Sequence, residues 1–109
     1  MQSLYFTLVR RQVVACAGPE ALAGKLGSPE WQVGLTSVGD WQVSTAFLGI
    51  DWNYGRGKPA LFETVLYHGD VLHGLHARYA TWERAEAGHL RAVARLRQRL
   101  GCPGDLPER

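Results

Sequence analysis

The segment RYATWERAEAGH, residues 78–89, combines side chains that can bind an anion with the start signals of a helix. Thr81 can cap this helix, which then begins at Trp82. The first turn of a helix presents unpaired N–H groups and a positive dipole to a phosphate or carboxylate. Arg78 adds a bidentate donor, and Tyr79 or Trp82 can stack on a nucleobase. We therefore expect this segment to be a strand–helix junction and a ligand site at once.

Two acidic residues bear on the same site. We expect Glu63 and Asp51 to lie opposite Arg78, where they contact ribose hydroxyls or hold the guanidinium in place. A purely structural alternative is an ion pair between Arg78 and Glu63 beneath a packed Trp82. The sequence leaves both interpretations open.

The segment DWNYGRGK, residues 51–58, is predicted to be an exposed loop with a second group of binding residues. Trp52 and Tyr54 offer aromatic faces, and Arg56 and Lys58 offer positive charge. Its two glycines leave backbone N–H groups free to approach an anion. The alternative is a surface loop whose aromatic rings pack back onto the sheet.

Glu86 and His89 fall, by helical spacing, on the same face of the last helix as its apolar residues. A Glu-x-x-His pair can supply two metal ligands, but carboxylate-bridged metal sites need two such helices and this chain has one. We therefore predict no metal and no cofactor, and a buried His89 held by Glu86 or by a backbone carbonyl. The complete predicted ligand-binding set is Asp51, Trp52, Tyr54, Arg56, Glu63, Arg78, Tyr79, Trp82, Glu86 and His89.

The elements that must position these residues follow from hydrophobic periodicity and turn signals. The expected order is strand, strand, helix, four strands in a meander and a final helix. The first two strands lie within 4–16, and a short helix follows over 18–27. The meander consists of a hairpin over 31–52, a strand over 60–67 and a strand that ends at Tyr79, and the final helix spans 82–100. This order predicts one α+β domain over residues 1–101, with a mostly antiparallel sheet and the C-terminal helix packed on one face. Residues 102–109 are expected to form a flexible tail.

Alternation within the hairpin also predicts which side chains share a face. In its first strand we expect Trp31, Val33, Leu35 and Ser37 on one face, and in its second Trp41, Val43, Thr45 and Phe47. Gly39 and Asp40 supply the tight turn between the strands.

Composition limits the classes of partner. The net charge of +2 is too small to indicate a nucleic-acid partner. No apolar run approaches the roughly 18 residues of a membrane span, so we expect no membrane association and a cytoplasmic location. A domain of this size leaves much of its surface exposed, and with four Trp, four Tyr and three Phe we expect some aromatic surface to serve a ligand or a homo-oligomer.

Three segments together, VSTAFLGID (43–51), LFETVLY (61–67) and RYATWERAEAGH (78–89), resemble a family of small bacteriophage and prophage proteins. The family pattern is V-S-T-x-F-L-G-x-D-H, then L-F-E-T-M, then R-Y-x-T-W-x-E-A-x-x-G-H. The chain departs from it at Trp52, where the family has His, at Val65 and at Arg84. The resemblance implies a phage-encoded accessory protein acting in the host cytoplasm.

These observations lead to three functional hypotheses. The first is a non-catalytic counter-defence module that binds and sequesters a small anionic, nucleotide-like signalling molecule. The second is an inhibitor that binds a host protein. The third is a small hydrolase that uses Glu63, Glu86 and His89 as acid–base groups.

Overall fold

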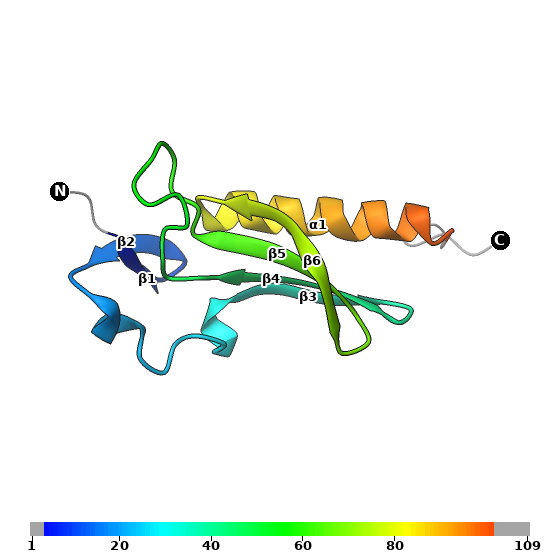
Figure 1. Cartoon of the computed structure of the whole chain (residues 1–109), viewed down its shortest axis with the longest axis horizontal. Coiled ribbons are helices and arrows are strands. Elements are labelled where there is room, and N and C mark those ends of the chain that lie inside the picture. The colour runs from blue at the N-terminus through cyan, green and yellow to red at the C-terminus, as the bar shows by residue number, and fades with distance from the viewer. Residues whose placement is uncertain (1–3, 102–109) are drawn as a thin grey trace.

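The fold consists of two antiparallel sheets and one long helix (Figure 1). The computed structural model describes residues 4–101, so the predicted tail at 102–109 lies outside the described residues. One sheet pairs β1 (Tyr5–Val9) with β2 (Gln12–Cys16), and the helix is α1 (Trp82–Arg99). The larger sheet follows chain order: β3 (Gln32–Val38), β4 (Trp41–Phe47), β5 (Phe62–His68) and β6 (Val71–Tyr79). The predicted α+β order is confirmed.

Short turns connect neighbouring strands because their residues accept left-handed backbone conformations. Gly39, with φ of 60°, makes the predicted turn between β3 and β4. Arg10 and Arg11 turn β1 into β2 with φ of 54° and 69°, an uncommon conformation for residues with a side chain. The hairpins β1–β2 and β3–β4 are thus closed by short turns, whereas a long loop, residues 48–61, joins β4 to β5. The four-stranded sheet is a simple meander.

The helix expected over 18–27 is shorter than predicted. Within this range the chain forms a single 3₁₀ turn, Pro19–Leu22. Gly24 and Gly27 have φ of 74° and 77°, so the right-handed helix cannot continue through them. A second 3₁₀ turn, Pro29–Trp31, follows and was not predicted.

The predicted face of β3 is wrong at its start. Trp31 is buried at 2% exposure, whereas Leu35, expected on the same face, is 56% exposed. A register shift between Gln32 and Gly34 explains the difference, since one extra residue reverses which side chains face the core. In β4 the predicted face is confirmed from Val43 to Phe47.

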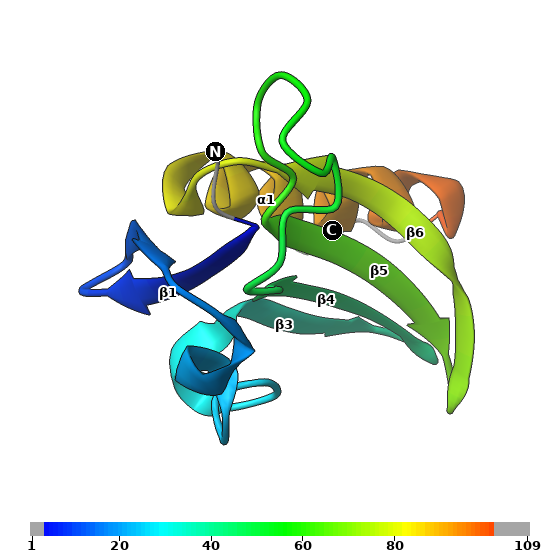
Figure 2. The same ribbon diagram turned by 60° about the vertical axis from the view of Figure 1, so that its left-hand side comes forward.

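Helix α1 lies along one side of the four-stranded sheet (Figures 1 and 2). Its Ala85, His89, Val93 and Leu96 are buried, in agreement with the predicted apolar face that includes His89. Glu86, which we expected on this packed face, is exposed, because it falls just beyond the edge of the buried stripe. Within residues 4–101, no helix is both long and apolar enough to cross a membrane.

The core between α1 and the sheet has two apolar parts. One, at the start of α1, contains Trp31, Phe47, Phe62 and Trp82, and β1 and β2 pack against it. The other, toward the end of α1, is a separate apolar cluster made of Val38, Val43, Ala92, Val93 and Leu96. The residues between these parts are polar, and they are described below.

Thr81 caps α1 as predicted: its Oγ1 accepts a hydrogen bond from Arg84 N at 3.1 Å. Replacing Thr81 by Ala removes this acceptor, and the free energy of unfolding should fall by about 1 kcal/mol. Urea unfolding followed by circular dichroism measures the change. Thr81→Ser is the control, because serine keeps the hydroxyl, and it should unfold like the wild type. Equal stability of the Ala variant would contradict the cap.

Candidate functional site

A polar layer crosses the core between its two apolar parts. It contains one side chain from each strand of the larger sheet and one from α1, namely Thr36, Thr45, Thr64, Tyr79 and His89. His89 Nε2 lies 2.8 Å from Thr36 Oγ1, and His89 Nδ1 lies 2.8 Å from Thr45 Oγ1. Thr45 Oγ1 is 2.5 Å from Thr64 Oγ1, which donates to the Tyr79 hydroxyl at 3.2 Å. The expectation that Glu86 or a backbone carbonyl holds His89 is therefore wrong.

Two glycines make room for this layer. A Cβ atom at Gly34 would lie 2.7 Å from the His89 ring, closer than side chains approach one another. A Cβ atom at Gly88 would overlap the Tyr79 ring in the same way. Gly88 thus permits the close approach of Tyr79, a strand residue, to α1.

The directions of these hydrogen bonds define the protonation of His89. Because Thr64 donates to Tyr79, its own oxygen must accept from Thr45, which in turn accepts from His89 Nδ1–H. His89 Nε2 is then the acceptor for the Thr36 hydroxyl. Burial lowers the pKa of His89, which agrees with a neutral imidazole.

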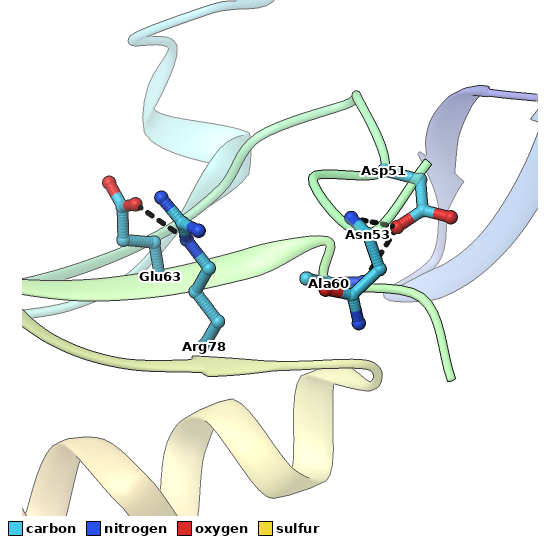
Figure 3. Close-up of polar contacts among 5 residues, drawn as sticks. All are labelled: Asp51, Asn53, Ala60, Glu63 and Arg78. Carbon is cyan, nitrogen blue, oxygen red and sulfur yellow. Dashed lines mark hydrogen bonds and ion pairs between the residues drawn. The ribbon is translucent and has the colours of Figure 1, made fainter. Parts of the chain in front are cut away.

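Asp51 organises the loop between β4 and β5 (Figure 3). Its Oδ1 accepts from the backbone N–H groups of Asn53 and Ala60 at 2.8 and 3.0 Å, and its Oδ2 accepts from Gly55 N at 2.8 Å. Burial of this carboxylate raises its pKa, but the three backbone hydrogen bonds outweigh burial, and the pKa of Asp51 is lowered overall. The backbone N–H groups of the loop therefore bind the Asp51 carboxylate rather than an external anion. The expectation that the Gly55 N–H group is free for a ligand is wrong.

Glu63 and Arg78 form the ion pair that was the structural alternative at the sequence level. Arg78 Nε lies 3.2 Å from Glu63 Oε1, on the side of the sheet away from α1 (Figure 3). The Trp52 ring lies next to the same guanidinium, with its centroid 5.3 Å from Arg78 Cζ. Tyr54 stands beside Trp52 at a centroid distance of 6.4 Å. Arg78 is thus held between a carboxylate and an aromatic ring.

Beside this pair, a groove of about 620 Å³ runs between the loop and the first half of α1. Its lining includes four cationic residues from three separate segments, Lys58, Arg78, Arg84 and Arg91, and one acidic residue, Glu83. Asn53 Nδ2 donates to the Lys58 carbonyl at 2.7 Å and so fixes the loop at the groove wall. Within residues 4–101, no carboxylate lies within ion-pair distance of Lys58, Arg84 or Arg91.

The structure brings together some of the predicted ligand-binding residues and separates others. Arg78 and Tyr79 line the groove, while Trp52, Tyr54 and Arg56 are exposed on the loop outside it. Three predicted residues, Asp51, Trp82 and His89, are buried and make structural contacts. In particular, Trp82 packs edge-on against Phe62 and carries Arg11 over its ring, so its face is not offered to a ligand.

Sequence reasoning missed the helical side of the groove. Arg84 and Arg91 are seven residues apart with Ala87 between them, a spacing that places all three on one face of a helix. That spacing was the available signal.

The acid–base set of the hydrolase hypothesis does not converge. Glu63 is paired with Arg78 on the side of the sheet away from α1, whereas His89 is buried beneath α1 on the other side. Glu86 is exposed on the helix and makes no hydrogen bond or ion pair within the described residues. Among residues 4–101, no group of three or more His, Cys, Asp or Glu side chains is arranged to hold a metal ion.

Comparison with protein-family models, with curated proteins and with solved structures found no match for this chain. The resemblance to phage proteins therefore stays a prediction.

The lowered pKa of His89 predicts a pH dependence of stability. The unfolded chain, with an ordinary His pKa of 6.5, takes up a proton more readily than the folded chain. The free energy of unfolding should therefore decrease as the pH falls below 6.5, until it reaches the folded pKa. Urea unfolding at a series of pH values measures this slope. It should flatten in His89→Gln and persist in His68→Gln, which replaces an exposed histidine. Equal slopes in all three proteins would refute the assignment.

The lowered pKa of Asp51 predicts a second pH dependence of the free energy of unfolding, at lower pH. Asp51→Asn replaces a charged acceptor of three N–H groups, so the free energy of unfolding at pH 7 should fall by about 2 kcal/mol. Because the folded pKa is lowered, the contribution of Asp51 is complete above 3.8 and is lost as the pH falls through the folded value. The wild type and the variant should therefore converge in acid. The control is Asp40→Asn, at an exposed turn, and a loss of similar size there would contradict the special role of Asp51.

Proposed function

We propose that this protein is a non-catalytic binding module that sequesters a small anionic, nucleotide-like molecule in the groove between α1 and the 53–60 loop. The observation that carries the proposal is the group of four cationic residues from three segments around one groove. Three of these cations lack an ion-pair partner within the described residues. An anionic ligand would neutralise them.

The residue types suit an oxyanion such as a phosphate or a carboxylate. Three of the four cations are arginines, whose planar guanidinium donates two parallel hydrogen bonds to a phosphate or carboxylate. The groove is also of suitable size, since ligand pockets commonly span about 300–1,000 Å³. Tyr79 and Pro59 in the lining add apolar surface for the uncharged part of a ligand.

The loop wall of this groove is stabilised in advance. Asp51 and Asn53 tie the loop to itself through backbone groups, so Lys58 is positioned without a ligand. A site whose walls are ordered beforehand loses less entropy on binding. Sequestration needs tight binding, and a preorganised groove favours it.

The biological role that we propose comes from the sequence resemblance. A phage-encoded protein that binds a nucleotide signal would withdraw it from a host defence response. The protein would then act stoichiometrically, and the bound nucleotide would be released intact on denaturation. Chromatography of the ligand after heat denaturation distinguishes this sequestration from hydrolysis.

The test is binding of a defined panel of AMP, ADP, ATP, a cyclic dinucleotide and inorganic pyrophosphate, by thermal shift and calorimetry. At least one nucleotide should raise the melting temperature, because a ligand at one hundred times its Kd adds about 2.7 kcal/mol of stability. Arg84→Ala and Arg91→Ala should each weaken binding about tenfold or more, since each removes a charge-assisted contact.

Arg95→Ala is the matched control on the same helix, because Arg95 lies outside the groove lining. On the loop, Lys58→Ala should also weaken binding, and Arg56→Ala is its control because Arg56 lies outside the groove lining. Both controls should bind like the wild type. If no compound in the panel binds, or if Arg84→Ala and Arg91→Ala bind as tightly as Arg95→Ala, the proposal is wrong.

A further inference from the structure

The face of the four-stranded sheet turned away from α1, here called the open face, is formed by three cross-strand rows of side chains. Strand register defines the rows as Ser37–Gln42–Tyr67–Leu72, then Leu35–Ser44–Val65–Leu75, then Gln32–Ala46–Glu63–Arg78. Directly paired residues in an antiparallel sheet point to the same side, so each row crosses all four strands. Helix α1 covers the opposite face, where Val43, Thr45, Phe62 and Thr64 are buried.

Large apolar side chains are exposed on the open face. Leu35, Leu72 and Leu75 have exposed fractions of 56%, 58% and 51%, and they stand at both edge strands of the sheet. Val65 and Tyr67, between them, are partly exposed. Leu72 and Leu75 on β6 adjoin Val65 and Tyr67 on β5, whereas Gln42 and Ser44 of β4 separate this group from Leu35. Exposed apolar side chains grouped in this way indicate an interaction surface rather than a surface adapted to water.

The open face carries almost no net charge. Its charged residues are Glu63 and Arg78, which neutralise each other at one corner. The other positions of the three rows are apolar or uncharged polar. A neutral face does not attract a partner of opposite charge, but two identical neutral faces can pack together without electrostatic repulsion.

We propose that a second copy of this chain covers the open face, so that two four-stranded sheets pack face to face with the α1 helices outside. A two-layer arrangement of sheets buries the apolar side chains that one layer leaves exposed.

The available area is sufficient for such a dimer. Seven-residue strands at about 3.3 Å per residue and four strands at about 4.8 Å spacing give a face of roughly 23 by 19 Å. Two such faces give about 900 Å² in projection, close to the lower limit of about 1,000 Å² for a specific interface, and their corrugated accessible surface exceeds the projected area.

This inference is independent of the proposed ligand site. Apart from Arg78, the cations of the groove belong to α1 and to the loop, and none of the exposed leucines of the open face lines the groove. A dimer of this form would therefore present two grooves. If the protein bound no nucleotide, the proposal of a dimer would still stand. If the protein were a monomer, the proposal of an anion-binding groove would still stand.

The experiment is sedimentation velocity of the full chain over a range of concentrations. The wild type should sediment as a dimer that dissociates on dilution, and its melting temperature should rise with protein concentration. The double variant Leu35→Glu/Leu75→Glu should be a monomer at every concentration, because it places like charges opposite each other across the interface. Both leucines are exposed in the single chain, so the variant should keep the circular dichroism spectrum of the wild type.

Leu90→Glu is the matched control. Leu90 is 65% exposed on α1, outside the sheet, and this variant should remain a dimer. A wild type that is a monomer at all concentrations, with a melting temperature independent of concentration, would overturn the proposal. So would a folded Leu35→Glu/Leu75→Glu variant that still sediments as a dimer, or a Leu90→Glu variant that is monomeric.

Discussion

The architecture depends on the hydrogen bonds of His89, because they connect α1 to every strand of the larger sheet. The imidazole contacts Thr36 and Thr45 directly, and Thr45 continues the chain to Thr64 and Tyr79. Buried polar groups are stabilising only when their partners are in place, and leaving one unpaired costs about 1–3 kcal/mol. A slip of any strand by one residue would turn its hydroxyl away from this layer. The network therefore specifies strand register and the position of α1 along the sheet, which the apolar parts on either side would specify less strictly.

Two sets of interactions between charged side chains and their neighbours order the surface beside the start of α1. The Asp51 carboxylate accepts three backbone N–H groups and so orders the 53–60 loop from within. The Glu63–Arg78 pair and the Trp52 ring hold the arginine on the other side of β6. The groove cations Lys58, Arg84 and Arg91 have no ion-pair partner within residues 4–101, which is also true of exposed arginines outside the groove such as Arg56 and Arg95. The internal hydrogen bonds and the ion pair thus stabilise the loop and β6, and the cations that line the groove support our proposal of an anion site.

The sheet has two faces with different requirements. The face toward α1 is closed by apolar packing and by the polar layer, and the open face exposes leucines at both edges. If our two proposals hold, ligand binding and dimer formation use opposite sides of one small domain. Each can then be removed by substitution without disturbing the other.

Local signals in the sequence determined the element order, the turn at Gly39, the Thr81 cap and the buried stripe of Ala85, His89, Val93 and Leu96. These features depend on neighbours within a few residues, which is why periodicity and capping preferences predict them. The tertiary structure alone decided what His89 contacts, because Thr36, Thr45 and Thr64 are distant in the chain and no spacing rule relates them. It also decided that the Gly55 N–H group belongs to Asp51, and that Lys58 joins Arg84 and Arg91 around one groove. Such contacts depend on how strands and helix pack in three dimensions, and a linear pattern carries that information only in part.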